Sequence, residues 1–150
     1  MASHAQAHSA DANAQIERLR KLGVRVTPQK VLILQALAAY GGHMTADEIL
    51  SAVTPHYQAL NLATVYRALE MLSRLGVVTE IDMGSGATQF ELAGTPHHHL
   101  VCERCGSVSE MDDEIFLELR NHLLQRYAFA ANPRHLALFG RCAQCQGKAL

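Results

Sequence analysis

The chain has 150 residues, which is enough for one ordinary domain or two small ones. Acidic and basic side chains nearly balance at a formal net charge of −1, so overall charge predicts no nucleic-acid partner and any DNA-binding surface must be local. No stretch approaches the ~20 apolar residues of a membrane span, and the N-terminus shows no secretory signal. We therefore expect a cytoplasmic protein with no membrane partner.

The N-terminal end combines a polar tail with a basic stretch. Residues 1–13 are mostly Ala, Ser and His with few large apolar side chains, and we predict a mobile tail there. Basic residues then crowd together, opposed only by Glu17: Arg18, Arg20, Lys21, Arg25 and Lys30. Such a cluster is either the solvated face of a helix or part of a nucleic-acid-binding surface, and composition does not decide between them.

The segment after the basic stretch predicts two helices. Thr27-Pro28 is a good helix start, with Thr as the N-cap and Pro at the first helical position, and the two glycines at 41–42 end that helix. Thr45 and Glu48 fit a capping box, in which each side chain accepts a hydrogen bond from the other residue's backbone N–H. The second helix is therefore expected to be short and to begin beside Thr45.

A longer helix and a hairpin are expected next. Asn61 is a suitable N-cap for the helix, and Gly76 is a suitable stop after its apolar face. Strand-like runs cover residues 77–82 and 87–92, with a glycine-rich turn at residues 83–86. This order of elements predicts a winged helix-turn-helix, in which a helix, a short helix, a longer helix and a β-hairpin follow one another.

The pattern breaks at residues 93–96, where we place a hinge between two domains. The first domain then covers residues 14–92 and the second residues 97–150. The second domain has strand-like segments on either side of a helical one, at residues 97–102, 113–127 and 136–139. The chain is therefore predicted to be an α+β protein, in which an α/β domain follows a winged helix.

All four cysteines occur as two C-x-x-C pairs. Cys102 pairs with Cys105, and Cys142 pairs with Cys145. In a cytosolic chain such pairs bind metal more often than they form disulfides, although redox dithiols and free buried thiols are the alternatives. Four thiolates fill the tetrahedral shell of Zn(II) and leave no open position, so we predict a structural zinc that ties distant segments together.

A histidine run precedes the first cysteine pair. If His97-His98-His99 is a strand, His97 and His99 point to one face and His98 to the other. Two imidazoles can chelate one ion, and the remaining ligands must come from elsewhere; the candidates are His43, Glu91, Glu110, Glu80 and Asp82. A mixed nitrogen and oxygen shell suits Fe(II), Mn(II), Zn(II) or Ni(II).

Taken together, these motifs resemble the ferric uptake regulator (Fur) family. The resemblance covers roughly residues 15–146, and it is carried by residues 24–29 (VRVTPQ), 43–49 (HMTADEI), 61–67 (NLATVYR), 97–102 (HHHLVC) with Cys105, and 140–142 (GRC) with Cys145. It implies a winged-helix DNA-binding domain followed by an α/β dimerisation domain. It also implies a homodimer that represses transcription when a regulatory metal is bound.

The resemblance implies a regulatory metal site and a DNA-binding surface. The ligands that carry over are His43, Glu91, His97 and His99, with Glu110 as an additional carboxylate. An ion bound by residues from both domains would fix the angle across the hinge and favour one arrangement of the dimer. On the recognition helix the resemblance implies DNA contacts by Thr64, Tyr66 and Arg67, and it adds Arg25 from the basic stretch. The implied partner is an AT-rich palindromic operator in double-stranded DNA.

Differences between this chain and the usual patterns of the family restrict which metal it is expected to sense. Peroxide sensors of the family usually have Asp where this chain has Glu91, zinc sensors usually supply a further cysteine, and nickel sensors add histidines on the wing. We therefore expect Fe(II) or Mn(II), with Zn(II) able to substitute, and keep a peroxide, zinc or nickel sensor as the alternative. A further metal site is left open, with His98, His135 and either Glu114 or Glu118 as its ligands.

Two other classes of protein are alternatives to a DNA-binding regulator. A zinc hydrolase would need an open coordination position, and the chain has no H-E-x-x-H spacing, so we do not expect an enzyme. A zinc-stapled interaction module without a DNA role is the other alternative. It would predict that Tyr66 and Arg67 are dispensable for DNA binding.

Overall fold

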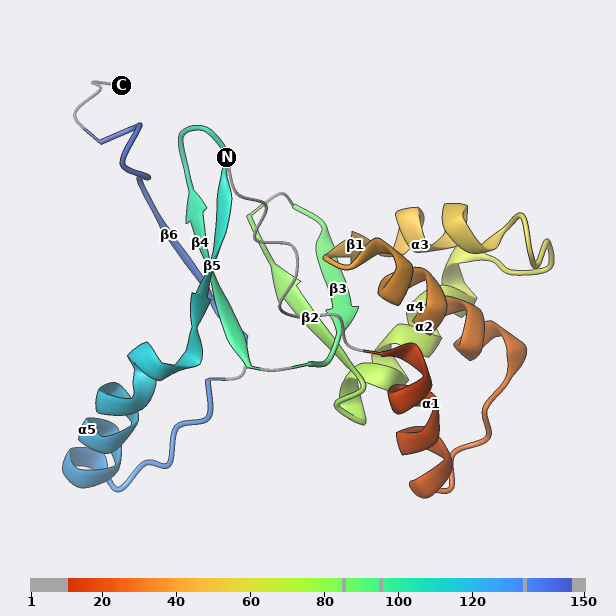
Figure 1. Cartoon of the computed structure of the whole chain (residues 1–150), viewed down its shortest axis with the longest axis horizontal. Helices are drawn as coiled ribbons and strands as arrows, with labels where there is room; N and C mark the ends of the chain where they lie inside the picture. The colour runs from red at the N-terminus through yellow and green to blue at the C-terminus, as the bar shows by residue number, and fades with distance from the viewer. Residues whose placement is uncertain (1–10, 85, 95, 134, 147–150) are drawn as a thin grey trace. The chain divides into compact units, whose positions relative to one another are not determined.

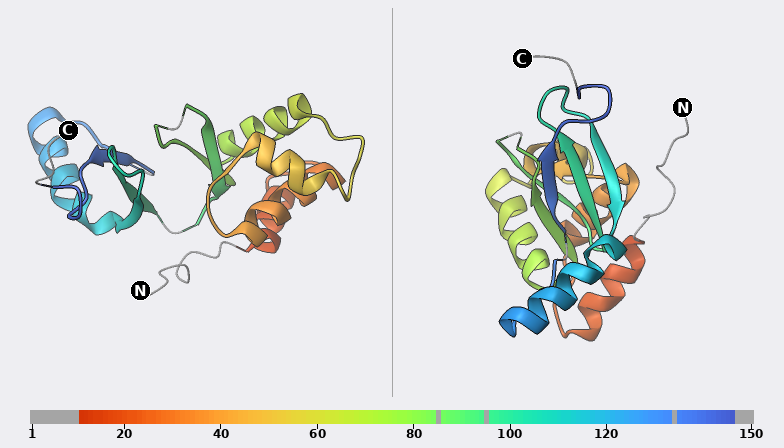
Figure 2. Two further views of the ribbon diagram at one scale, coloured as in Figure 1. Left: turned by 90° about the horizontal axis from the view of Figure 1, so that it is seen from above. Right: turned by 90° about the vertical axis from the view of Figure 1, so that its left-hand side faces the viewer.

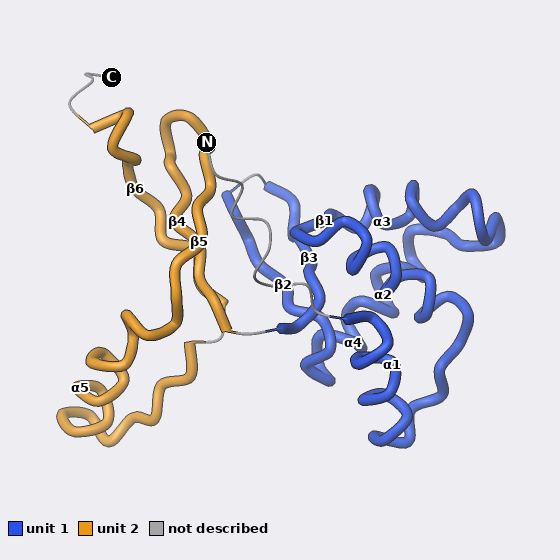
Figure 3. The backbone as a smooth tube through the Cα atoms, in the orientation of Figure 1, with its two compact units in different colours: residues 1–95 blue, residues 96–150 orange. Residues whose placement is uncertain are grey.

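The computed structural model describes residues 11–84, 86–94, 96–133 and 135–146. The chain divides between residues 95 and 96 into two compact units (Figure 3), a point that lies inside the segment expected to be a hinge. Helices and an antiparallel sheet form the first unit, and a mixed sheet with one helix forms the second (Figure 1). The predicted α+β class is confirmed.

Four helices form most of the first unit, and the second, third and fourth begin where the sequence predicts. Thr45 accepts a hydrogen bond from the Glu48 backbone N–H while the Glu48 carboxylate accepts one from the Thr45 N–H, and this capping box begins the third helix. The Asn61 side chain accepts a hydrogen bond of 2.9 Å from the Thr64 N–H and begins the fourth. The helices are α1 (Ala12–Lys21), α2 (Pro28–Tyr40), α3 (Ala46–Val53) and α4 (Leu62–Arg74).

Helix α1 begins inside the stretch that the sequence predicted to be a tail. The Asp11 side chain accepts a hydrogen bond of 2.8 Å from the Asn13 N–H, and the helix starts at Ala12. Ala12, Ile16 and Leu19 are buried against the other helices. The prediction was wrong for residues 11–13, because the small side chain of Ala12 fits a buried helical position that composition alone does not reveal. The rest of the predicted tail, residues 1–10, lies outside the described residues.

A three-stranded antiparallel sheet completes the first unit. Its strands are β1 (Met44–Thr45), β2 (Val78–Asp82) and β3 (Thr88–Leu92), in the order β1-β3-β2. The hairpin of β2 and β3 extends from the helical part of this unit (Figure 2). Its inward-facing side chains join the main core, which includes Leu34, Ile49, Leu69 and Phe90. The arrangement of α2, α3, α4 and the hairpin is that of a winged helix.

The second unit is built around one central strand. Strand β4 (His97–Cys102) pairs antiparallel with β5 (Val108–Asp112) and parallel with β6 (Ala137–Gly140). The connection from β5 to β6 contains a short 3-10 helix, η1 (Asp113–Phe116), and helix α5 (Leu117–Tyr127). The helix expected from residue 113 thus begins as a 3-10 turn, and β6 begins one residue later than expected.

Helix α5 has no buried residue within the single chain. Large apolar side chains on this helix and just beyond it are exposed: Leu117, Leu119, Leu124, Tyr127 and Phe129. An exposed apolar surface of this kind on a small unit is typical of a protein–protein contact.

None of the helices in the described part of the chain combines the length and the apolar character needed to cross a membrane.

Candidate metal centres and nucleic-acid interface

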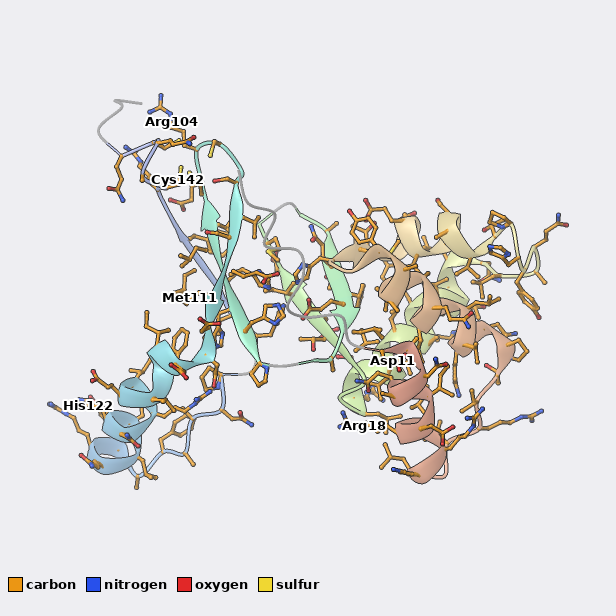
Figure 4. All side chains as sticks on the ribbon, in the orientation of Figure 1. Asp11, Arg18, Arg104, Met111, His122 and Cys142 are labelled. Carbon is orange, nitrogen blue, oxygen red and sulfur yellow. The ribbon has the colours of Figure 1, made fainter. Side chains whose placement is uncertain are left out.

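The four cysteines converge because two strands run parallel. Cys102 is the last residue of β4 and pairs in register with Gly140, the last residue of β6, so the segments that follow both strands lie at one edge of the sheet. Cys142 lies at this end of the unit (Figure 4). The four sulfur atoms lie within 4.8 Å of one another. All four residues are thiols, with Cys105 Sγ and Cys142 Sγ 3.8 Å apart.

The sulfur positions suit one tetrahedral ion. Thiolates bound to Zn(II) at about 2.3 Å lie about 3.8 Å from one another in a tetrahedron, which matches the separation of Cys105 and Cys142. A shell of four sulfurs is complete, so an ion held there has no position for water or substrate. This cluster therefore has the chemistry of a structural metal site and offers no place for a hydrolytic reaction.

The surroundings of the sulfurs lower the pKa of two of the thiols, Cys102 and Cys105, and raise the pKa of Cys145. Hydrogen bonds from the backbone N–H groups of Cys142, Cys105 and Arg104 lower the pKa of Cys102 to about 6. A side-chain hydrogen bond with Ser107 lowers the pKa of Cys105. Burial raises the pKa of the Cys145 thiol to about 12, so this thiol keeps its proton until a cation replaces it.

In the first unit, a histidine and a carboxylate form a buried pair. Met44 of β1 pairs in register with Phe90 of β3, and this antiparallel register places His43 beside Glu91. His43 Nε2 lies 3.1 Å from a Glu91 carboxylate oxygen, and the two side chains are only 14% and 11% exposed. Two ligand atoms at this separation can bind the same cation.

In the second unit, three imidazoles meet on one face of the sheet. The alternation of β4 places His97 and His99 on the same side, with ring centroids 4.8 Å apart. His135, which lies just before β6, faces both: its centroid is 4.8 Å from that of His97 and 4.7 Å from that of His99. His99 Nε2 and His135 Nε2 are 3.1 Å apart. Sequence reasoning did not place His135 in this group.

His98 points to the opposite face and is fully buried. Its Nε2 atom lies 2.9 Å from a carboxylate oxygen of Asp113, and its Nδ1 atom accepts a hydrogen bond of 3.2 Å from the Leu136 N–H. Since the Leu136 N–H can only donate, Nδ1 is the acceptor and Nε2 donates to Asp113. Both ring nitrogens of His98 are therefore engaged within the chain.

These contacts argue against the additional metal site that the sequence left open. That site needs His98 as a ligand together with His135, but the two histidines lie on different faces and His98 has no lone pair to offer. Glu114 and Glu118 are exposed. Glu110 is the cross-strand partner of His99 and is also exposed, and it does not belong to the groups of ligand atoms that converge among the described residues.

Asp113 receives a charged partner as well as His98. The Arg120 guanidinium donates two hydrogen bonds to its carboxylate, of 2.9 and 2.5 Å. These hydrogen bonds from Arg120, together with the one from His98, lower the pKa of Asp113 to about 2. The carboxylate therefore stays charged at pH values well above about 2, and it links β4 to α5.

The residues expected to contact DNA lie in the first unit and on its surface. Tyr66 is 47% exposed on α4, and Arg67 beside it is exposed. Thr64 is half-buried, and its hydroxyl donates to the Asn61 side chain that caps the helix. Arg25 is exposed in the loop before α2. The structure thus leaves Tyr66, Arg67 and Arg25 accessible, whereas Thr64 also serves the helix start.

Not all of the basic stretch is available to a polyanion. The Arg18 guanidinium, which points toward the end of α4 (Figure 4), donates to the carbonyl oxygens of Gly76 and Leu75. Arg20 forms an ion pair with Glu17. Part of the cluster therefore stabilises the unit, because Arg18 satisfies carbonyl groups left open at the end of the helix.

Comparison with known proteins agrees with these features. A model of the ferric uptake regulator family matches residues 21–139. The peroxide-responsive repressor PerR of Staphylococcus aureus is 32% identical over 133 residues, covering 89% of this chain and 90% of that protein. The structure of the ferric uptake regulator of Pseudomonas aeruginosa with manganese is 34% identical, with a TM-score of 0.71, and the match covers 86% of this chain and 98% of that one.

A more distant structure shows the same fold. The Fur protein of Helicobacter pylori has a TM-score of 0.73 at 20% identity, covering 95% of this chain and 99% of that one. The winged helix, the four-sulfur cluster and the histidine group together define a metal-binding winged-helix protein. The chain belongs to the ferric uptake regulator family, which confirms the resemblance seen in its motifs.

Replacement of Cys142 by serine is expected to remove metal from the cysteine cluster and unfold the second unit. The variant leaves three thiolates and an incomplete shell, and little else is buried in this unit. Metal analysis and far-UV circular dichroism measure the two effects. Ser107→Ala, which alters a neighbour of Cys105 that is not a sulfur ligand, should keep the metal. A Cys142→Ser protein with full zinc content and unchanged ellipticity would contradict this assignment.

Replacement of Asp113 by asparagine is expected to lower the thermal unfolding midpoint by a few degrees. A carboxylate with a lowered pKa stabilises the fold at pH values above its ordinary pKa of 3.8, and this contribution is lost only as the pH falls toward about 2. The difference between the variant and the native chain should therefore stay constant from pH 8 to pH 6. Asp112→Asn, at the exposed neighbouring position, is the control, and a difference that shrinks within this range would argue against the ion pair.

Proposed function

We propose that this protein is a metal-responsive, DNA-binding transcriptional repressor that works as a homodimer. The observation that carries the proposal is that each unit presents its own group of buried metal ligands. His43 and Glu91 meet in the winged-helix unit, and His97 and His99 lie side by side in the second unit. In this proposal one regulatory ion takes ligands from both groups, and the four cysteines hold a separate structural zinc.

The physical basis of the switch is a difference in metal affinity between two arrangements of the units. An arrangement in which His43 and Glu91 add their ligands to those of His97 and His99 binds the ion more tightly than one in which they do not. A shift from mostly one state to mostly the other needs about 5.5 kcal/mol of preference. Two further ligands on one ion are a sufficient source of that preference.

The regulatory ion that we propose is Fe(II) or Mn(II), and Zn(II) can take its place. The mixed set of imidazole and carboxylate ligands supports these ions, and the similar Pseudomonas aeruginosa protein has been solved with manganese. A peroxide-sensing role is the second candidate. The similarity to the peroxide-responsive repressor of Staphylococcus aureus favours it, and Glu91 in place of aspartate weighs against it.

The second unit supplies the dimer interface in this proposal. Helix α5 has no buried side chain within one chain, and apolar residues such as Leu124 and Phe129 are exposed beside it. A second copy of the unit would cover this surface. A symmetric dimer presents two copies of α4, which suits a palindromic operator with half-sites about one helical turn or a multiple of it apart.

Helix α4 is the proposed recognition helix in the major groove. The exposed Tyr66 ring would pack on thymine methyl groups, and this contact supports an AT-rich operator. Arg67 and Arg25 would contact phosphate or a base edge, and Thr64 lies at the same end of the helix. We place the protein in the cytoplasm, where its operator lies.

Binding to an AT-rich palindromic duplex is expected to require added Fe(II) or Mn(II). Native protein should retard the duplex only when the ion is present, and His99→Ala should lose this dependence together with most of the binding. Anaerobic mobility-shift titrations with each metal measure the effect. His122→Ala, which changes an exposed histidine on α5, is the matched control. Equal binding with and without metal would refute the switch and leave the DNA role intact.

Replacement of Arg67 by alanine is expected to weaken operator binding by about 1–3 kcal/mol if the guanidinium contacts a base edge. If it contacts phosphate, binding should weaken equally on all DNA sequences, and the slope of log affinity against log salt concentration should decrease by about one. Arg74→Ala is the control, because Arg74 is an exposed arginine on the same helix that pairs with Glu70. A Tyr66→Ala/Arg67→Ala double variant with undiminished DNA binding would favour the zinc-stapled interaction module instead.

A further inference from the structure

We propose that His135 is a direct ligand of the regulatory ion, so that the second unit by itself carries a three-imidazole metal site formed by His97, His99 and His135. This inference rests on the proposed function, because it enlarges the ligand set of that same site. It also predicts a relative effect on metal affinity, because a third imidazole strengthens the binding of Ni(II) and Zn(II) more than the binding of Mn(II).

The positions of the ring nitrogens fit a common ion. Two nitrogens that each lie about 2.0–2.1 Å from one metal are about 2.9–3.4 Å apart at octahedral to tetrahedral angles. The Nε2 atoms of His99 and His135 are 3.1 Å apart, within this interval. The three imidazoles offer ligand atoms that all lie within 4.8 Å of one another. This geometry allows each ring to direct one lone pair toward the same point.

A cluster of packed, hydrogen-bonded rings is the competing explanation, and the burial of the rings weighs against it. His97 and His99 are 4% and 1% exposed. In the contact between His99 and His135, two like nitrogens face each other, and only one of them can carry the proton of a hydrogen bond. Bringing three imidazoles together where two of them are almost fully buried is costly in desolvation, and a shared cation that accepts one lone pair from each ring offsets this cost.

The backbone places His135 at this point through the register of β4 and β6. Because His99 pairs with Ala137 in a parallel ladder, His135 falls beside His97 and its side chain points to the same face. The His99 N–H donates to the Leu136 carbonyl oxygen at 2.8 Å, which fixes the residue next to His135.

A second set of contacts holds the same segment from the other face of the sheet. The Leu136 N–H donates to His98 Nδ1, and His98 Nε2 donates to Asp113, whose carboxylate also accepts hydrogen bonds from Arg120. His98 is therefore a positioning residue for His135. Contacts of this kind keep a ligand oriented and are typical of metal sites.

A third imidazole adds more to the affinity for some ions than for others. Imidazole nitrogen suits Zn(II), Cu(II) and Ni(II), whereas Mn(II) prefers carboxylate, carbonyl and water oxygen. Removing one imidazole should therefore cost more affinity for Zn(II) or Ni(II) than for Mn(II). This difference separates a ligand from a residue that only packs in the site, since loss of packing would weaken the binding of all ions alike.

The test measures metal affinity in the full-length chain with zinc already bound at the cysteine cluster. Competition with a chromophoric chelator gives the Zn(II) and Ni(II) affinities, and electron paramagnetic resonance gives the affinity for Mn(II). We expect His135→Ala to lower the Zn(II) and Ni(II) affinities at least about 10-fold, the lower limit of the cost of losing even an outer-shell partner, and the Mn(II) affinity distinctly less. His122→Ala should change none of them.

Two further measurements keep the result clear if alanine at 135 disturbs folding. His135→Gln retains a polar side chain of similar size and should show the same loss of Zn(II) affinity. In the native chain, the ring nitrogens of His135 should shift on addition of Zn(II) in nitrogen-detected NMR spectra, whereas those of His122 should not.

The outcomes distinguish this inference from the proposed function. If His99→Ala loses regulatory metal but His135→Ala and His135→Gln do not, His135 is not a ligand and the inference is overturned while the proposed function stands. If none of the three variants alters metal binding, the proposed regulatory site itself is wrong. Equal losses for Zn(II), Ni(II) and Mn(II) in both His135 variants would show that His135 only packs in the site, and they would overturn the inference.

Discussion

The parallel pairing of β4 with β6 is the constraint on which both metal-ligand groups of the second unit depend. A single register pairs Cys102 with Gly140 and His99 with Ala137. It therefore fixes which segments meet at both ends of the ladder. At its C-terminal end it brings the two C-x-x-C pairs to the same edge of the sheet. At its N-terminal end it brings His135 beside His97. A slip of one residue would turn His135 to the other face, so a change in this register would disturb both ligand groups at once.

The second unit has few buried apolar side chains of its own. In the described part of the chain, the main hydrophobic core lies wholly in the first unit. The apolar residues buried in the second unit are few: Val101, Cys102, Phe116 and Cys145. The other buried side chains there are those of the histidine run, which need polar partners. A unit with so small a core requires a metal, a dimer contact or both to offset the entropy of folding. The cysteine cluster and the exposed face of α5 are suited to supply them.

Sequence patterns predicted the local features well and the long-range features only where spacing was specific. Capping residues such as Thr45 and Asn61 located helix starts, because a cap acts within a few residues. The doubled C-x-x-C pattern predicted that the sulfurs would converge, because few structures other than a metal site use that spacing. His135 was considered only for a further site with His98, which was left open, since its place beside His97 and His99 depends on a parallel register that no local pattern reveals. Helix α1 was missed in part because Ala12 is buried by tertiary packing, which composition does not show.

The two proposed roles of the histidines have different physical consequences for regulation. Ligands that lie in one unit, as His97, His99 and His135 do, bind the ion equally well in every arrangement of the two units. Such ligands raise metal affinity but shift no equilibrium, because only a difference in affinity between two states can do so. His43 and Glu91 belong to the other unit, and their contribution exists only in the arrangement that lets them reach the ion. On this argument, the imidazoles of the second unit set the metal concentration at which the repressor responds, and His43 and Glu91 set how completely it switches.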